Sequence, residues 1–227
     1  MQHIYEGKTK SVYKLDDDNY LLKFKDDMTG EDGVFDPGAN TVGLSIDGAG
    51  LAAVRMTEFF YSRIEAAGHP THFITADTST VPPTVTVKPA TFFGKGLEVI
   101  CRFRAVGSFL RRYGDYCEDG QPLEAFVEVT LKNDIRQDPP ISKDALVMLG
   151  ILTADEYDIL HTRTQQIAKI VKNILAERDI ELYDIKLEFG RVAGEITLID
   201  EISGGNMRAY KNGEYIEPLA LTDLLLS

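Results

Sequence analysis

Asp184-Ile185-Lys186-Leu187-Glu188-Phe189-Gly190 and the later stretch Leu198-Ile199-Asp200-Glu201-Ile202 are the most informative parts of this 227-residue chain. In the first stretch charged and apolar residues alternate, with Tyr183 continuing the apolar series, which is typical of a strand with one dry face and one charged face. A short connection with two glycines, residues 190–194, leads from the first stretch into Glu195-Ile196-Thr197-Leu198-Ile199, which begins the second strand. The sequence therefore predicts two strands joined as an antiparallel hairpin.

This hairpin would place the carboxylates of Glu188 and Asp200 on neighbouring strands. Mg²⁺ is a hard cation that takes one or two carboxylates together with nucleotide phosphate oxygens, so such a pair is sufficient to hold Mg-ATP. The register of the hairpin cannot be read from the sequence. A half-exposed hairpin whose charges are only solvated is the alternative interpretation, and it is the commoner one for this pattern.

The N-terminal region offers the complementary positive charge. Residues 6–13 include Gly7, Lys8 and Lys10, and a turn cluster over residues 16–19 leads into Tyr20-Leu21-Leu22-Lys23-Phe24, which predicts a second hairpin. A period of two puts Lys8 and Lys10 on one face, where ammonium groups could neutralise phosphate, and Gly7 would let the backbone approach a ligand. The chain has no Walker A motif, and a solvated strand face is the alternative.

Arginines are concentrated between residues 102 and 112. In Leu97-Glu98-Val99-Ile100-Cys101-Arg102-Phe103-Arg104, alternation places Arg102 and Arg104 on one face, and Gly107-Ser108 and two further arginines follow. Guanidinium groups bind carboxylates or phosphates in pairs of hydrogen bonds, and a Gly-Ser turn adds backbone and hydroxyl donors. The pattern indicates an anionic ligand. Because the chain has 36 acidic residues against 24 basic ones, pairing with surface carboxylates is an equally good interpretation.

Five segments, taken in order, resemble the phosphoribosylaminoimidazole-succinocarboxamide synthase (SAICAR synthetase) family nearly from end to end. They are Gly7-Lys8-Thr9-Lys10, Arg102-Phe103-Arg104-Ala105-Val106-Gly107-Ser108, Leu131-Lys132-Asn133-Asp134, Asp184 to Gly190, and Asp200-Glu201-Ile202-Ser203. The resemblance implies a ligase of purine biosynthesis that joins aspartate to aminoimidazole carboxylate ribonucleotide (CAIR), giving SAICAR, ADP and phosphate. It also implies an α+β, two-lobed, ATP-grasp-related fold with antiparallel sheets and a nucleotide cleft between the lobes.

The resemblance also implies roles for individual residues. Lys132 and Asp200 would be catalytic, and Glu188 and Asp200 would hold Mg²⁺. The ATP site would consist of Gly7, Lys8, Lys10, Lys132, Glu188 and Asp200. The other substrates would be bound by Asp32, Arg102, Gly107, Ser108 and Arg208. The segment Lys88-Pro89-Ala90 would form the hinge beside adenine.

Two segments depart from the family pattern. Ser203-Gly204-Gly205-Asn206-Met207-Arg208 lacks the Pro and Asp that members usually have after the Ser, and Asp47-Gly48-Ala49-Gly50 replaces their Gly-Lys-Gly. A paralogous ATP-dependent ligase acting on another carboxylate or amine is therefore one alternative. A nonenzymatic nucleotide-binding regulator is the other.

Composition indicates a cytoplasmic protein that acts on small molecules. The chain has no run of eighteen apolar residues, and its first residues lack the features of a signal peptide. Cys101 and Cys117 have no metal-ligand spacing, so reduced thiols are expected. A formal charge of −12 repels nucleic acid and anionic membranes and makes a local cationic pocket more meaningful.

The chain divides into an N-terminal ATP-binding lobe, residues 1–80, and a C-terminal lobe, residues 81–227, at the proline-bearing segment Val81-Pro82-Pro83-Thr84. Residues 51–67 have the spacing of a helix, and a capping box at Thr153 begins a long amphipathic helix that runs toward Arg178. The apolar stripe of this helix could mediate a homodimer, but packing on a sheet is the commoner use of such a stripe. His69 and His72 flank a turn and form at most a weak metal site.

Overall fold

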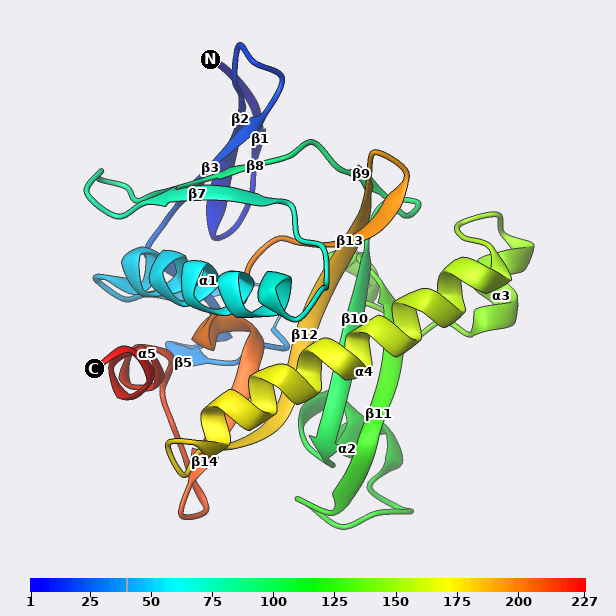
Figure 1. Cartoon of the computed structure of the whole chain (residues 1–227). Helices are drawn as coiled ribbons and strands as arrows, with labels where there is room; N and C mark the ends of the chain where they lie inside the picture. The colour runs from blue at the N-terminus through cyan, green and yellow to red at the C-terminus, as the bar shows by residue number, and fades with distance from the viewer. Residues whose placement is uncertain (40) are drawn as a thin grey trace.

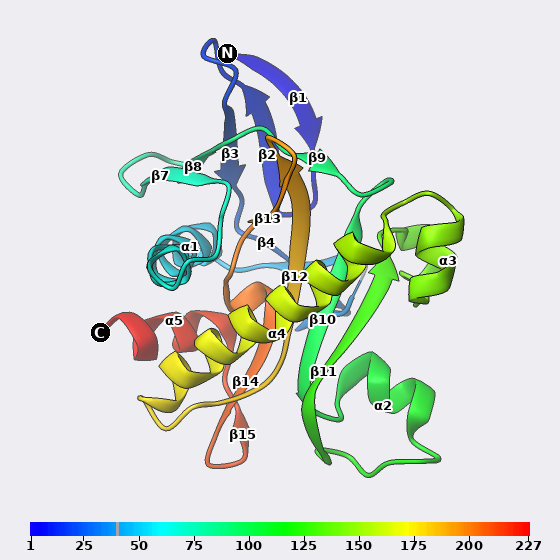
Figure 2. The ribbon, with the colours of Figure 1, turned by 45° about the vertical axis from the view of Figure 1, so that its right-hand side comes forward.

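The structure, a computed structural model, describes residues 1–39 and 41–227. Two large antiparallel sheets and one small one form the framework, and helices pack on and between them (Figures 1 and 2). The N-terminal sheet has the order β1-β2-β3-β8-β7, with bounds Gln2–Glu6, Lys10–Lys14, Tyr20–Phe24, Thr84–Val87 and Phe73–Asp77. The small sheet contains β4 (Asp27–Glu31), β5 (Val34–Phe35) and β6 (Val42–Ser45). This mixed helix and antiparallel-sheet architecture is the predicted fold class.

The second large sheet carries most of the C-terminal half of the chain. Its main path is β11-β10-β12-β14-β15, and β9 and β13 also pair with β12. The bounds are Thr91–Phe92 for β9, Leu97–Arg104 for β10, Pro122–Leu131 for β11, Glu181–Val192 for β12, Glu195–Ile199 for β13, Met207–Lys211 for β14 and Glu214–Tyr215 for β15. The helices are α1 (Ala49–Ala66), α2 (Gly107–Tyr113), α3 (Lys143–Met148), α4 (Ala154–Ala176) and α5 (Pro218–Leu226), and two short 3₁₀ turns cover Asp134–Arg136 and Gly204–Asn206.

Helix α4 crosses one face of the second sheet and contacts β10, β11 and β12 (Figure 1). Thr153 caps its N-terminus, and the reciprocal hydrogen bond from the Thr153 amide to the Glu156 carboxylate completes the predicted capping box. Leu160, Ile167 and Val171 are fully buried in the main hydrophobic core. The apolar stripe thus packs on the sheet, as the commoner interpretation holds.

The N-terminal sheet packs on α1 through a smaller core. Leu22, Phe24, Val54, Val85 and Val87 form this cluster. The predicted hairpin of β2 and β3 is present, with Lys10 opposite Phe24 and Lys14 opposite Tyr20. One detail of that prediction is wrong, because residues 7–9 form the turn between β1 and β2, so Lys8 lies in a turn and not on a strand.

Strand β8 lies beyond the predicted lobe boundary at residue 80. It nevertheless pairs with β3 and with β7, so the N-terminal sheet extends to Val87. The division into residues 1–80 and 81–227 is retained as a proposal about the lobes. Within the described residues, no helix is long and apolar enough to cross a membrane.

The hairpin of β12 and β13 is present, and it corrects two expectations. A shift in register between Leu182 and Asp184 places Leu182 in the core, so the half-exposed Tyr183 does not continue the dry face and stacks on Tyr210. The second strand covers Glu195–Ile199 as predicted, but its predicted continuation through residues 200–202 is wrong. Asp200 has a φ of 70°, which breaks the extended backbone at this point.

Candidate active site

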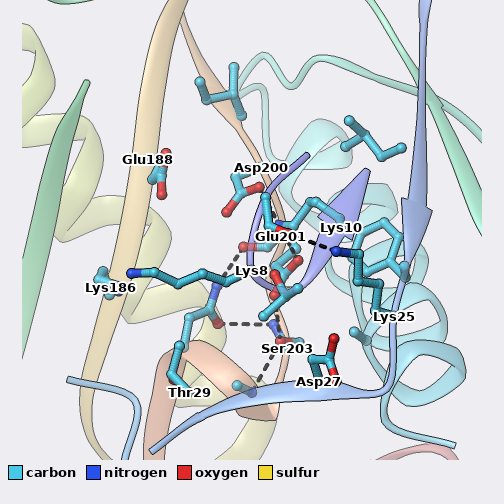
Figure 3. A pocket seen from close by; sticks show the side chains of 18 of the residues that line it. Lys8, Lys10, Lys25, Asp27, Thr29, Lys186, Glu188, Asp200, Glu201 and Ser203 are labelled. Carbon is cyan, nitrogen blue, oxygen red and sulfur yellow. Dashed lines mark hydrogen bonds and ion pairs between the residues drawn. The ribbon is translucent and has the colours of Figure 1, made fainter. Parts of the chain in front are cut away.

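A cavity of about 700 Å³ lies between the N-terminal sheet, the second large sheet and the start of α1. Every residue predicted to bind ATP or metal lines it, namely Gly7, Lys8, Lys10, Lys132, Glu188 and Asp200. The labelled lysines and carboxylates project into this space from opposite walls (Figure 3). The six residues come from four parts of the chain separated by up to about 190 positions, and only the fold brings them together.

One part of the cavity wall is apolar. Val12, Leu22 and Val87 from the N-terminal sheet and Ile199 from the end of β13 contribute to it. Lys88 and Ala90, from the segment predicted to be the hinge, line the same cavity. A flat aromatic ring fits an apolar wall of this kind.

Lys10 is the cationic centre of one group of charges. Its Nζ lies 2.5 Å from Asp200 Oδ1 and also contacts Glu201 Oε2. Burial opposes the charged form of Lys10, but attraction to these two carboxylates outweighs it and raises the lysine pKa. Burial alone would raise the pKa of Asp200; attraction to Lys10 and Lys132 lowers it instead, so Asp200 is an anion at neutral pH.

Lys132, which follows β11, and Glu188 of β12 form a second group. Lys132 Nζ lies 2.6 Å from Glu188 Oε1. Burial, together with repulsion from Asp200, raises the pKa of Glu188 despite the contact with Lys132. Nearly half of the Lys132 side chain is exposed, so solvent screens part of this attraction. Glu188 is therefore a carboxylate that a further cation would stabilise.

The turn at residues 7–9 lies at the edge of the cavity. Lys8 Nζ is 2.7 Å from Asp134 Oδ1. A Cβ on Gly7 would stand 2.9 Å from the carbonyl oxygen of Lys10, so a side chain there would force the tight turn apart. Gly7 thus permits the turn that presents Lys8 beside Lys10.

The charge of the cavity differs from that of the chain. Seven lysines and six acidic residues line it, a formal balance of +1 in a chain of −12. These residues are Lys8, Lys10, Lys25, Lys88, Lys95, Lys132 and Lys186, with Asp27, Glu98, Asp134, Glu188, Asp200 and Glu201. A small polyanion is therefore attracted locally although the whole molecule is acidic.

Arg102 and Arg208, both predicted to bind substrate, belong to a separate and largely buried cluster, whereas Arg104 forms a surface pair with Glu181. Arg102 is 1% exposed, and its guanidinium lies 2.8 Å from Asp184 Oδ2, 3.1 Å from Glu128 Oε1 and 2.9 Å from the Ser108 hydroxyl. It does not line the cavity described above. Arg102 is thus paired with carboxylates, but buried ones, which neither interpretation of the sequence anticipated.

Arg208 links this cluster to the small sheet. Its guanidinium contacts Asp184 Oδ2 at 2.8 Å and Asp36 Oδ1 at 2.7 Å. Gly107 has a φ of 57°, and a Cβ there would meet the Arg208 guanidinium at 2.8 Å, so glycine is required at this approach. Four of the five residues predicted to bind substrate, Arg102, Gly107, Ser108 and Arg208, therefore lie together.

Asp32, the fifth, lies apart. It is exposed in the turn between β4 and β5, and Asp36 is the carboxylate of this region that contacts Arg208. Sequence reasoning assigned no role to Asp36, Glu128 or Lys186. Lys186 could have been found, because it lies on the charged face of β12 with Glu188, lines the cavity and holds Glu98 at 2.9 Å. Glu128 and Asp36 carry no sequence signal that separates them from other acidic residues.

The two segments that depart from the family pattern both border the cavity. Ser203 caps the 3₁₀ turn of residues 204–206, in which Asn206 Oδ1 accepts from the Ser203 amide at 3.0 Å. Ala49 begins α1, and the Gly50 amide donates to Asp26 at 2.9 Å. Both segments are thus ordered by their own hydrogen bonds. Among the residues that the structure describes, no cluster of three or more His, Cys, Asp and Glu suited to a metal is found, and His72 instead contacts a backbone carbonyl.

Comparison with known proteins places the chain among its relatives. A sequence model of SAICAR synthetase matches residues 3–220. The phosphoribosylaminoimidazole-succinocarboxamide synthase of Clostridium tetani is 64% identical over the full length of both chains. The solved structure of the same enzyme from Ehrlichia chaffeensis has a TM-score of 0.83 at 26% identity, covering 95% of this chain and 89% of that one. A SAICAR synthetase in complex with ADP has a TM-score of 0.82 at 31% identity, covering 94% and 87%.

Proposed function

The chain belongs to the SAICAR synthetase family, and we propose how its residues carry out the reaction of that family. It is an ATP-dependent carbon–nitrogen ligase that forms SAICAR in purine biosynthesis. We propose that CAIR and aspartate are its other two substrates and that Mg²⁺ accompanies ATP. The convergence of six predicted residues on one cavity is the observation that carries the residue assignments.

The nucleotide is proposed to enter the cavity with its base against the apolar wall of Leu22 and Val87, beside the hinge at Lys88. Its phosphates are then directed at Lys8, Lys10 and Lys132, whose ammonium groups line the same space. The ADP bound by a relative of similar fold supports a nucleotide site in this architecture. Strand and turn residues, not a Walker loop, bind the phosphates in this arrangement.

The residues present fit a magnesium ion. Glu188 and Asp200 are half-buried carboxylates on adjoining parts of one hairpin, and carboxylate oxygens are the protein ligands that Mg²⁺ prefers. The raised pKa of Glu188 reflects burial and repulsion that a divalent cation would relieve. When bound with ATP, Mg²⁺ would neutralise charge on the phosphate groups during transfer.

The reaction is proposed to pass through an acyl phosphate. A carboxylate is a poor acyl donor, because its leaving group would be oxide. The CAIR carboxylate oxygen therefore attacks the γ-phosphorus of ATP and ADP leaves; the amine of aspartate then attacks the acyl carbon and phosphate leaves. Lys10 and Lys132 stabilise the charge on the transferring group, and the rest of the site brings the reactants together. No covalent protein nucleophile is needed.

The buried arginine cluster is proposed to bind the ribonucleotide. Arg102, Ser108 and Arg208 present guanidinium and hydroxyl donors, and Gly107 leaves room for Arg208. Asp184, Asp36 and Glu128 occupy these donors in the structure, so a phosphate must share or displace their contacts. Asp32 is proposed as a further substrate contact from the small sheet, although it lies outside the cavity.

Coupled ADP release with Mg-ATP, aspartate and CAIR, omitting each in turn, tests this function. Turnover that requires all three substrates is expected. Binding of ATP without turnover would favour a paralogous ligase, to which the altered segments at Ala49 and Ser203 point. If the protein binds ATP but hydrolyses it with none of the carboxylate and amine pairs tested, a nucleotide-binding regulator would be favoured. We further propose a cytoplasmic location and a homodimer, which fractionation and sedimentation velocity would test.

A further inference from the structure

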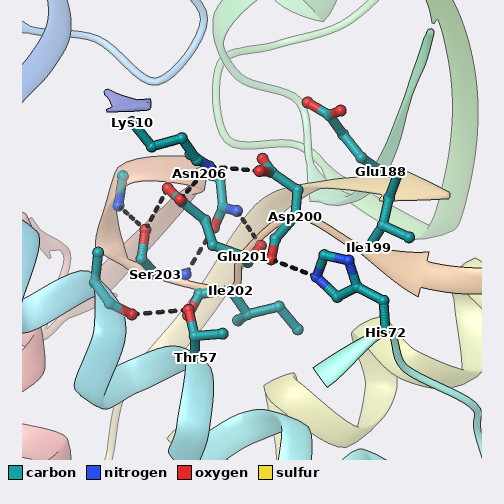
Figure 4. A network of polar contacts seen from close by, with 12 residues as sticks. Lys10, Thr57, His72, Glu188, Ile199, Asp200, Glu201, Ile202, Ser203 and Asn206 are labelled. Carbon is teal, nitrogen blue, oxygen red and sulfur yellow. Dashed lines mark hydrogen bonds and ion pairs between the residues drawn. The ribbon is translucent and has the colours of Figure 1, made fainter. Parts of the chain in front are cut away.

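The backbone turns sharply at Asp200, directly after β13 ends. Asp200 has a φ of 70°, a conformation that costs a residue other than glycine free energy and persists only where its surroundings enforce it. Successive side chains of an extended strand point to opposite faces, so Asp200 and Glu201 would diverge if the strand continued. Instead both carboxylates contact the ammonium group of Lys10 (Figure 4). The turn thus brings two adjacent carboxylates to one side of the cavity.

Three consecutive backbone carbonyls at this turn each accept a hydrogen bond from a side chain. The Tyr61 hydroxyl donates to Ile199 O at 3.0 Å, and the His72 Nε2–H donates to Asp200 O at 3.1 Å. Asn206 Nδ2 donates to the carbonyl of Glu201 at 2.7 Å. A run of backbone groups held by side chains replaces the ladder hydrogen bonds that a strand would have made.

The three donors are themselves fixed. Tyr61 is fully buried in α1, and His72 and Asn206 are 5% and 8% exposed. Because a carbonyl oxygen can only accept a hydrogen bond, the contact requires His72 to carry its proton on Nε2. Burial lowers the pKa of His72 to about 4, so the ring is neutral at pH 7. Asn206 is oriented because its Oδ1 accepts from the amide of Ser203 at 3.0 Å.

The Thr57 hydroxyl does not belong to this set. It lies 3.4 Å from the carbonyl of Ile202, but its nearer partner is the Ala53 carbonyl of its own helix at 2.8 Å. One hydroxyl proton serves one acceptor well, so the closer contact takes it. The donors to the turn therefore come from α1, from the segment before β7 and from the 3₁₀ turn after Ser203, three separate parts of the chain.

We propose that Tyr61, His72 and Asn206 are positioning residues of the ligase, which hold residues 199–201 in the left-handed turn that directs Asp200 and Glu201 toward Lys10 and the metal-nucleotide site. The role of the turn in catalysis rests on the proposed assignment of Asp200 to Mg²⁺. The three residues bind the backbone carbonyls of residues 199–201. Replacing them therefore changes the direction of the Asp200 side chain without removing a charge from the cavity.

Tyr61→Phe is the sharpest variant, because it removes one hydroxyl and keeps the ring. Tyr215→Phe is its matched control, since the Tyr215 hydroxyl is buried without a hydrogen-bond partner in the described part of the chain. Hydrogen exchange of a peptide covering residues 199–203 should become about fivefold faster in Tyr61→Phe, the effect of one net hydrogen bond, and stay unchanged in the control. The ratio of ADP affinities with Mg²⁺ and with EDTA should fall by about the same factor.

His72 gives a second, independent pair. His72→Gln keeps an N–H donor, so its exchange rate over residues 199–203 and its ratio of ADP affinities should stay near those of the unmodified protein. His72→Leu has no donor, so its exchange should be faster and its affinity ratio lower. Unchanged exchange in folded Tyr61→Phe and His72→Leu would overturn the proposal, and so would equal changes in Tyr215→Phe. If Asp200→Asn leaves the Mg²⁺-dependence of ADP binding unchanged, the assignment of Asp200 to the metal fails. In that case, faster exchange in Tyr61→Phe would still support the conclusion that Tyr61 stabilises the turn at residues 199–201.

Discussion

Replacing Arg102 with methionine should destabilise the folded protein strongly, because it removes the central cation of a buried network. Arg102, Arg112 and Arg208 face the three carboxylates of Asp36, Glu128 and Asp184, a balanced set of charges. Breaking a buried ion pair by removing one partner costs about 3–5 kcal/mol. Asp184 keeps Arg208 and Glu128 keeps Arg112, so the low end of this range, about 3 kcal/mol, is expected.

Urea unfolding followed by circular dichroism measures this loss, since the chain has no tryptophan for fluorescence. A decrease of about 3 kcal/mol corresponds to a melting temperature about 9 °C lower for a chain of this size. Arg104→Met on the same strand is the control: Arg104 pairs with Glu181 at 2.6 Å, but the two side chains are 31% and 44% exposed. That surface pair should contribute at most about 1 kcal/mol.

Equal stability of Arg102→Met and Arg104→Met would refute the reasoning, because it would mean that burial adds nothing to the pairing. Binding assays on the folded fraction then separate structure from recognition. ADP affinity should be unchanged, since Arg102 does not line the nucleotide cavity. CAIR affinity should fall by roughly 30-fold if Arg102 makes a buried charged contact with the ribonucleotide, as proposed.

Three further predictions concern the two sides of the cavity and the core. Asp200→Asn should lower kcat by at least ~100-fold with the fold intact, and near-normal turnover would exclude its metal role. In the native protein a thiol reagent should label Cys117 and spare Cys101, which is buried with a pKa raised to about 12; two reactive native thiols would contradict this. Unfolded His72 binds a proton near pH 6.5 and the folded residue only near pH 4, so the unfolding free energy should fall by up to about 3 kcal/mol as the pH drops through this window, and His72→Gln should flatten that slope.

The strand and turn that carry part of the cavity wall were predictable because their signals are local, whereas the roles of their residues came from the resemblance to a family. Alternation over residues 184–190 located β12, and the glycine before Lys8 and Lys10 marked a tight approach of the backbone. The arginine cluster was only partly predictable. Alternation placed Arg102 correctly on the polar face of β10, but its partners Glu128 and Asp184 lie 26 and 82 positions away, and their pairing depends on strand order.

The end of β13 shows why other details could not be read from the sequence. Ile202 continues the apolar series of Leu198, so the pattern favours a longer strand. The left-handed turn at Asp200 is stabilised by hydrogen bonds from Tyr61 and His72, which lie more than 120 residues away. Tertiary contacts of this kind override a local preference, and they do so next to the residues assigned to function.

The charge pairs of the cavity link the proposed roles to one another. Lys8 pairs with Asp134, Lys10 with Asp200, and Lys132 with Glu188, so each ammonium group assigned to phosphate already has a carboxylate partner. If phosphate oxygens take over Lys10 and Lys132, the half-buried carboxylates of Asp200 and Glu188 lose their partners, and an unpaired charge that is shielded from water is costly.

These two carboxylates would then need a new cation, which the Mg²⁺ proposed to accompany ATP would supply. Metal and nucleotide are therefore expected to bind as a unit, because each compensates for contacts that the other displaces. The same exchange would let an acidic chain of charge −12 admit a polyanion, because the cavity would give up internal ion pairs and form equivalent ones with its ligand.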